Sequence, residues 1–357
     1  MNLFFAGNAS VHDSISYFSE FKLHYGFIMP HHKNMQHLTT GHFTAYELNF
    51  NFQTHGEKKW HCLFKYPVIG GAIWYADLAN PVVLGKAVAA YPYLNFHLYN
   101  KNNFFLNYRF GIGLGYISKP FNYNDNYKNI AIGSHLNAAI NMFYECKWLV
   151  KKKISLTSGI GITHFSNGSF KTPNLGINIP TVFAGIAYYF PDKTNILPDT
   201  SWKNISENKI SLRIYFAGGM KQLYPALGDY YGVFMTSFNF YKSFSYKREV
   251  AAGIDVYMDY SDKRVLKRKD IVLKNDLGIL KPGLYAGHNF VFSRLRLLTH
   301  IGYYLYAKDK SDGMIYSRFG LEYNFNEKLF AHLALKTHFA KADFIEWGIG
   351  YTIKHKN

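Results

Sequence analysis

Bulky apolar residues at alternate positions are the feature that most constrains the fold of this sequence. From Phe104 to Tyr116 the even positions carry large apolar side chains, whereas the odd positions include Asn107, Arg109 and three glycines. Because side chains alternate between the two faces of a β-strand, one face is bulky and apolar and the other is small or polar. Glycine weakens a strand, so a solvated face is seldom filled with it. A narrow barrel with its apolar face in lipid explains both faces.

The same alternation recurs along the whole chain. It returns at residues 209–217 and 315–325, and we count about eight such segments before Phe190 and about eight after Lys209. A polar stretch between the halves contains two prolines and has the composition of a linker. The predicted domains are a barrel over residues 10–191, a linker over 192–208 and a second barrel-like half over 209–357.

Two arrangements fit this pattern. The chain forms either two tandem eight-stranded antiparallel outer-membrane barrels or one barrel of about sixteen strands. Inward-facing glycines suit the narrow lumen of eight strands, so we favour two barrels. Residues 41–52 also echo residues 231–240, each near the start of its half, which suggests a degenerate duplication. A second echo, between 163–165 and 337–339, is weak because His338 lies on the face opposite to the apolar positions.

Composition is consistent with an all-β membrane protein. Aromatic residues make up 18% of the chain, yet the mean hydropathy is −0.15. We find no run of about 18 apolar residues, so a membrane-spanning helix is not expected. A membrane barrel needs an apolar residue only at every second position and keeps near-neutral hydropathy.

The net charge of +17 implies an anionic partner. Nucleic acid and an anionic lipid surface are the two candidates, and a merely solvated basic surface is the alternative. No segment resembles a nucleic-acid-binding module, and the basic residues are scattered through predicted turns, so we expect a membrane partner and no nucleic acid.

The chain start and the two cysteines are less informative. Residues 1–9 lack a basic region, and their apolar core is too short for a full signal peptide. A truncated or missing signal would explain this start, and so would an intracellular protein. Cys62 and Cys146 have no metal-ligand spacing, and whether they pair is open.

A histidine and a serine on one strand form the candidate site. His164 and Ser166 are two residues apart, so their side chains share a face and their Cα atoms lie about 6.6–7 Å apart. They continue the apolar stripe that includes Ile160 and Ile162. Polar groups on a lipid-facing surface are costly unless they act there, whereas near the membrane interface they cost little. The pair is either a base and a nucleophile or two ordinary rim residues.

The residues around this pair resemble a known motif. His164-Phe165-Ser166-Asn167-Gly168, followed by Pro173-Asn174-Leu175-Gly176-Ile177-Asn178, is similar to the active-site signature of the outer-membrane lipid A 3-O-deacylases of the PagL type, within the acyloxyacyl hydrolase-like proteins. The resemblance covers residues from about 15 to 190 and is matched in spacing as well as identity.

This resemblance implies an eight-stranded barrel with a lipid-facing triad that cleaves the ester-linked acyl chain at position 3 of lipid A. Ser166 would be the nucleophile and His164 the general base. Asn167 and the backbone around Gly168 would stabilise the oxyanion, with Asn174 supporting the site. The implied partner is lipopolysaccharide in the outer membrane, and no metal or cofactor is expected.

One position departs from the family pattern, which has a glutamate where this chain has Asn178. An asparagine can accept a hydrogen bond from the imidazole and hold its tautomer, but it supplies no charge to stabilise the imidazolium. Either activity is weak or another carboxylate substitutes. Glu145 is the nearest carboxylate by sequence, yet the expected hairpin register places it opposite Gly159, too far away. We therefore expect Asn178 to orient His164 and count it with Ser166 and His164 as catalytic.

Two other functions remain open from the sequence. The chain could be a non-catalytic barrel, structural or a pore, that retains the motif, or a soluble β-rich lipid-binding protein. The second half contains no chemistry that we can interpret. Its scattered histidines lack partners at ligand spacing, and we interpret them as ordinary strand or rim residues: His288, His300, His332 and His338.

Overall fold

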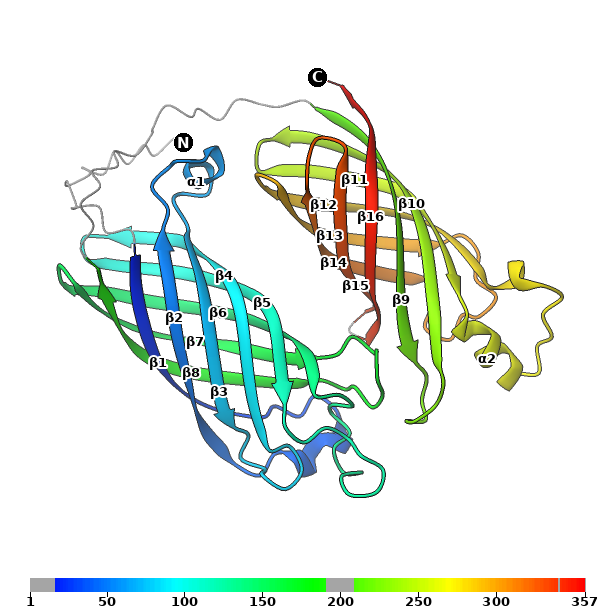
Figure 1. Cartoon of the computed structure of the whole chain (residues 1–357), viewed down its shortest axis with the longest axis horizontal. Helices are drawn as coiled ribbons and strands as arrows, with labels where there is room; N and C mark the ends of the chain where they lie inside the picture. Colours follow the sequence, from blue (N-terminus) through cyan, green and yellow to red (C-terminus); the bar gives the residue numbers. More distant parts are fainter. Residues whose placement is uncertain (1–16, 191–208, 340, 357) are drawn as a thin grey trace.

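The computed structural model describes residues 17–190, 209–339 and 341–356, and it contains two closed antiparallel barrels of eight strands each (Figure 1). In each barrel the strands are hydrogen-bonded to one another in chain order, and the first strand closes on the last. The prediction of two tandem barrels is confirmed, and the alternative of one large barrel is wrong. The predicted linker and the chain start lie outside the described residues.

Barrel 1 contains the motif. Its strands are β1 (Tyr17–Phe27), β2 (His42–Gln53), β3 (Val68–Asp77), β4 (Lys86–Lys101), β5 (Phe104–Ile117), β6 (Leu136–Lys151), β7 (Ile154–Ser166) and β8 (Ile177–Tyr189). Its short helices are η1 (Lys33–Leu38) and α1 (Lys59–Leu63).

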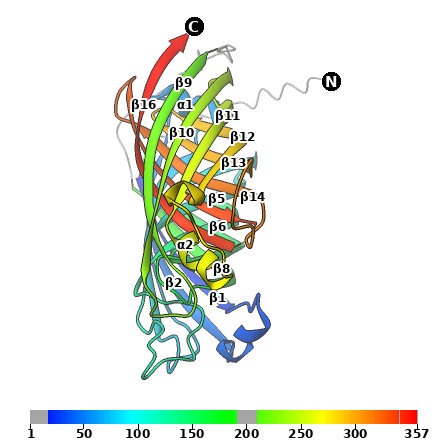
Figure 2. The same cartoon turned by 90° about the vertical axis from the view of Figure 1, so that its right-hand side faces the viewer.

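Barrel 2 stands beside barrel 1. Its strands are β9 (Ile210–Gln222), β10 (Tyr230–Ser245), β11 (Arg248–Asp259), β12 (Leu280–Phe292), β13 (Leu295–Tyr304), β14 (Ile315–Asn324), β15 (Leu329–His338) and β16 (Lys341–Lys356). Its helices are α2 (Ser261–Arg268) and η2 (Asp276–Ile279). Helix α2 projects from barrel 2 on the side away from barrel 1 (Figure 1), and it faces the viewer in Figure 2. Among the described residues, no helix has the length and apolar character that a membrane span requires.

The alternation in sequence becomes the inside and outside of each barrel. Along β7, Leu156 and Ile160 are 50% and 59% exposed on the outer wall, whereas Ser155 and Thr157 are buried in the lumen. The inward glycines leave room for bulky neighbours, since a Cβ at Gly161 would lie 1.8 Å from a ring carbon of Phe143. Small residues therefore let eight strands close around filled lumens.

Paired charges occupy the middle of the lumen of barrel 1. The Arg109 guanidinium donates hydrogen bonds to Glu47 at 2.7 Å and to Asn49 at 3.0 Å. Lys22 donates to Glu145, and all four charged side chains are fully buried. Buried charges are tolerated when they are paired in this way.

Barrel 2 has an equivalent interior. Its fully buried Arg318 donates to Asp255 at 2.8 Å and to Glu346 at 2.9 Å. Packed side chains in the middle of both lumens are typical of eight-stranded barrels and argue against a wide water-filled pore. Two of the scattered histidines of this half, His300 and His332, are buried and belong to this interior.

Both sequence echoes fall on equivalent strands. Residues 41–52 largely form β2 and residues 231–240 lie in β10, the second strand of each barrel. Residues 163–165 lie in β7, and 337–338 end β15, the seventh strand of each. As the alternation predicts, His338 is buried and contacts Lys336 at 3.2 Å, so the chemistry of His164 is not repeated there.

Four connections meet at one end of barrel 1, which we call the loop end: residues 28–41, 78–85, 118–135 and 167–176. A buried apolar cluster fills the lumen there, including Trp74, Phe165 and Ile177. The β7–β8 connection, which carries the motif, is therefore anchored by a packed core beneath it.

Candidate active site

Strand β7 carries His164 and Ser166 to the outer wall at the loop end. The residues between and before them, Thr163 and Phe165, point inward and are fully buried. The Phe165 ring packs against Trp74, with ring centroids 5.8 Å apart. The inward side chains thus anchor the end of β7, so the His164 and Ser166 side chains point outward.

Asn178 lies directly across from His164 on β8. The two residues are register partners, and the Asn178 side-chain oxygen lies 2.6 Å from His164 Nδ1. Cross-strand partners on the same face of a sheet are close enough for their side chains to interact. The pairing places an acceptor on Nδ1 of the imidazole and leaves Nε2 outside this hydrogen bond.

A residue that the sequence reasoning missed completes this arrangement. His31, in the β1–β2 connection, places Nδ1 3.1 Å from the Asn178 side-chain nitrogen and Nε2 2.8 Å from the Leu175 carbonyl oxygen. The Met29 amide also donates to the Asn178 carbonyl at 2.9 Å, which docks the connection on β8. His31 and Asn178 are 147 positions apart, so no local pattern could have signalled the contact.

The chain of hydrogen bonds determines one tautomer. A carbonyl oxygen only accepts, so His31 Nε2 donates to Leu175, and an NH₂ group only donates, so His31 Nδ1 accepts from Asn178. Asn178 then turns its NH₂ group to His31 and its oxygen to His164. His164 therefore carries its proton on Nδ1 and leaves Nε2 as the free base.

Two donors converge on the Ser166 hydroxyl oxygen. The Gly168 amide lies 3.2 Å from it, and Asn174 Nδ2 lies 2.9 Å from it. Asn174 is held in turn by the Asn167 amide, which donates to its side-chain oxygen at 3.1 Å. In the described part of the chain the Ser166 hydroxyl bonds to these two donors and not to the His164 ring.

The side chain of Asn167 is used to hold the loop together. Its Nδ2 donates to Ser134 Oγ and to the Lys171 carbonyl, both at 2.8 Å, and the residue is 4% exposed. These bonds join the β7–β8 connection to the β5–β6 connection. Asn167 thus contributes rigidity to the loop, and the donors nearest to Ser166 belong to Gly168 and Asn174.

Two glycines make this geometry possible. Gly168 has φ +63° and Gly176 has φ +83°, values in the left-handed backbone region that residues other than glycine rarely adopt. A Cβ at Gly176 would also lie 2.8 Å from the His164 ring. A larger residue at position 176 would displace the imidazole from its partners.

Glu145 does not serve this site. It is paired with Gly159, as the hairpin register predicts, and its fully buried carboxylate faces the lumen. There it accepts from Lys22 and from Asn95. Within the described residues, no group of three or more His, Cys, Asp or Glu side chains is placed to hold a metal ion. Asn178 is therefore the side chain that the structure brings to His164.

An apolar groove lies near the site on the outer wall of barrel 1. It has a volume of about 680 Å³ and is lined in part by Ile160, Ile162, Pro180 and Val182. Ile162 precedes His164 by two positions on the outer face of β7, and Pro180 follows Asn178 by two on β8. The groove is therefore lined by the outward residues that come next to His164 and Asn178 along the two strands.

Comparison with known proteins agrees with this arrangement. Residues 44–187 match the family model described as "Lipid A 3-O-deacylase (PagL)", and residues 210–355 match "Acyloxyacyl hydrolase, C-terminal domain". The chain belongs to the PagL-type, acyloxyacyl hydrolase-like family. The suspected resemblance is confirmed, and this hydrolase family acts on acyl esters of lipid A. The two PagL-related matches correspond to the two barrels.

Other comparisons add little. The crystal structure of Neisserial surface protein A matches with a TM-score of 0.35 and 9% identity over 50% of this chain and 98% of that chain. A porin of Rhodopseudomonas blastica matches with a TM-score of 0.19 and 10% identity over 95% and 99%. At these scores neither likeness carries an argument about this chain. The comparison with curated proteins gave no match.

Proposed function

We propose that this chain is an outer-membrane serine esterase that removes an ester-linked acyl chain, at the 3-O position, from lipid A. The observation that carries the proposal is the His164–Asn178 pair, 2.6 Å apart on the outer wall and two residues from Ser166. A base with a fixed tautomer beside a hydroxyl is the arrangement that nucleophilic catalysis requires. The family and the barrel fold support the same location and substrate class.

The first half-reaction forms an acyl-enzyme. His164 Nε2 takes the proton from Ser166 Oγ as that oxygen attacks the ester carbonyl carbon. Negative charge develops on the carbonyl oxygen beside Oγ, where the Gly168 amide and Asn174 Nδ2 can donate to it. The intermediate then collapses, the sugar oxygen leaves with the proton from His164, and the acyl group stays on Ser166.

The second half-reaction releases the fatty acid. Water gives a proton to His164 Nε2 and attacks the acyl-enzyme carbonyl, and the same two donors stabilise the second oxyanion. Collapse returns the proton to Ser166 Oγ. Asn178 and His31 are positioning residues throughout, because they hold the imidazole and do not touch the reacting atoms.

The surroundings suit an amphiphilic substrate. The acyl chain would lie in the groove along Ile160 and Val182, with the ester at the level of Ser166 and the sugar beyond the loop end. Lysines occur in three of the four connections there: Lys33, Lys119, Lys128 and Lys171. Basic side chains at a membrane surface favour an anionic lipid headgroup.

The test is fatty acid release from purified lipopolysaccharide by the full chain in detergent. We expect release of a 3-hydroxy fatty acid by the wild-type protein and a loss of at least about 10³-fold for Ser166→Ala. A matched control is Ser158→Ala, which changes an outward serine on the same strand. Absence of release by the wild-type protein, or equal release by Ser166→Ala, would favour a non-catalytic barrel that retains the motif.

A further inference from the structure

The β7–β8 connection touches both barrels. Besides its bonds within barrel 1, it packs on the wall of barrel 2 formed by β15, β16 and β9. This contact lies directly behind Gly168, whose amide points at the nucleophile. The second barrel therefore reaches the back of the proposed oxyanion site through apolar side chains.

Gly168 fits between two apolar side chains of barrel 2. A Cβ added to Gly168 would meet the Ile345 side chain at 2.5 Å and Leu335 at 3.3 Å. Ile345 lies on the outer face of β16, in line with Trp347 and Ile349, which are 63% and 66% exposed. The contact with Gly168 thus covers one position of an otherwise exposed stripe.

Hydrogen bonds fasten the residues that follow Gly168. Ser169 Oγ donates to the Ala342 carbonyl at 2.8 Å, and the Gln222 amide donates to the Ser169 carbonyl at 3.1 Å. The Thr172 amide donates to Gln222 Oε1 at 3.0 Å. The loop backbone is therefore held by β9 on one side and β16 on the other.

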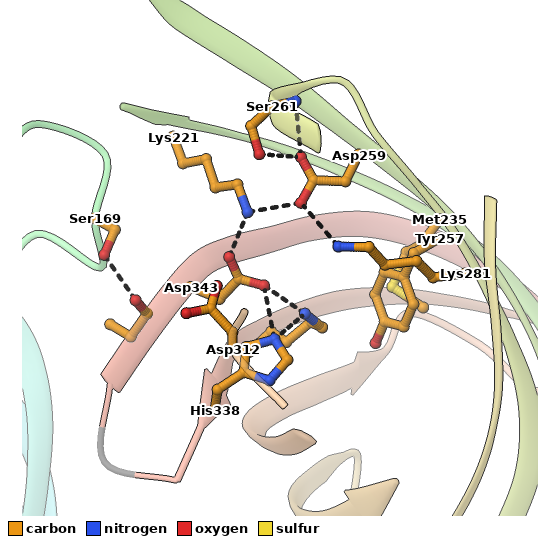
Figure 3. Close-up of polar contacts among 12 residues, drawn as sticks. Ser169, Lys221, Met235, Tyr257, Asp259, Ser261, Lys281, Asp312, His338 and Asp343 are labelled. Atoms are coloured by element: carbon orange, nitrogen blue, oxygen red, sulfur yellow. Dashed lines mark hydrogen bonds and ion pairs between the residues drawn. The ribbon is translucent and has the colours of Figure 1, made fainter. Parts of the chain in front are cut away.

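A charged cluster in the lumen supports this wall from behind. Asp343, next to Ala342 on β16, accepts from Lys221 at 2.5 Å and pairs with Lys336. Lys221 also donates to Asp259 at 2.6 Å, so the cluster joins β9, β11, β15 and β16. Figure 3 shows Ser169 reaching β16 on one side while Asp343 and Lys221 meet on the other.

A second contact fixes the placement of the barrels at their opposite end. The Phe64 ring, beside α1 of barrel 1, stacks on Phe292 of barrel 2 with centroids 4.4 Å apart. Trp60 meets the same ring edge-on at 6.1 Å. The two barrels therefore contact each other at both ends, beside Gly168 and beside α1.

We propose that barrel 2 is a positioning domain for the esterase site, and that Ile345 and Leu335 hold the Gly168 amide in place for the oxyanion. This inference rests on the proposed function. Displacement of a catalytic group by about 1 Å can cost about 10²-fold in rate. A donor that acts mainly in the transition state affects kcat more than KM.

The test compares two isoleucines of one strand in the full chain. Ile345→Ala removes the contact with Gly168, whereas Ile349→Ala removes the same atoms from an exposed position. We expect Ile345→Ala to lower kcat about tenfold with KM within about twofold, Ile345→Val to restore most of it, and Ile349→Ala to match the wild type. Equal kcat for Ile345→Ala and wild type, or equal losses for both alanine variants, would overturn the inference.

A second readout does not depend on activity. Hydrogen–deuterium exchange of the peptide spanning residues 167–173 should be faster in Ile345→Ala than in the wild type or Ile349→Ala, while exchange in β1–β6 stays unchanged. Unchanged exchange in this peptide would overturn the bracing itself. If the wild-type protein releases no fatty acid, the proposed function fails, and the exchange data still decide whether barrel 2 holds the loop.

Discussion

Asn178→Asp tests how the site works with an amide in place of a carboxylate. The change keeps the side chain the same length and replaces the oxygen 2.6 Å from His164 Nδ1 with a charged acceptor. Because the transition state carries an imidazolium, the new charge stabilises it more than the ground state. We therefore expect kcat to rise.

The size of the gain follows from the hydrogen bond. A bond to a charged group contributes about 1.5–3 kcal/mol, against about 0.5–1.5 kcal/mol for a neutral pair. The difference of about 1–1.5 kcal/mol corresponds to a rise of roughly 5- to 13-fold in kcat. In serine proteases the reverse change costs about 10⁴ because it also allows the wrong tautomer. Here His31 already fixes the tautomer of His164, so Asn178→Asp cannot gain the part of that factor of about 10⁴ that comes from correcting the tautomer.

The assay is the initial rate of fatty acid release at saturating lipopolysaccharide, with Ser166→Ala as the blank. A rise in kcat near tenfold supports the chain of hydrogen bonds from Leu175 through His31 and Asn178 to His164. A rise near 10⁴ would mean that the wild-type tautomer is not fixed, and the role of His31 would be refuted. An unchanged or lower kcat would refute Asn178 as the partner of the imidazole.

Three further changes test other parts of the structure. His31→Phe should lower kcat about tenfold, because the Asn178 amide is then free to flip. In an Asn178→Asp background the same change should have little effect, because the two carboxylate oxygens are equivalent, and additive losses would contradict this. Val182→Trp narrows the groove from an exposed position, so it should lower kcat/KM more for substrates with long acyl chains than for those with short ones. An equal loss for both would contradict binding of the acyl chain in the groove. Arg318→Met removes the buried guanidinium that pairs with Asp255 and Glu346, and it should lower the free energy of unfolding in urea by about 3–5 kcal/mol. Lys341→Met, at a surface pair, should change that free energy by less than about 1 kcal/mol. Equal effects of the two changes would contradict the role of the lumen pairs.

The barrels could be predicted from sequence because their pattern is local. A side-chain period of two assigns each strand residue to lipid or lumen, and Leu156 and Thr157 lie as that rule requires. The inward glycines also predicted the narrow lumen, where Gly161 leaves space for Phe143. Even the position of Glu145 opposite Gly159 followed from hairpin register. These features depend on neighbours along one strand or across one hairpin.

The site could be predicted only in part because its remaining contacts are long-range. The motif predicted a site at His164, Ser166 and Asn178, but the orientation of the Asn178 amide depends on His31, 147 positions away. The bracing of the loop depends on Ala342, 173 positions from Ser169. Connections have no period from which such contacts can be read.

The polar groups of this site can lie on a lipid-facing wall because they satisfy one another. An unpaired polar group in an apolar environment costs several kcal/mol, so an imidazole, an amide and a hydroxyl there need partners. His164 is paired with Asn178, Asn178 with His31, and Ser166 with Asn174. The hydrogen bonds that satisfy these polar groups also fix the tautomer of His164 and orient the donors toward Ser166. The proposed catalysis with an amide beside His164 therefore depends on a second side chain that orients the amide, and His31 occupies that position.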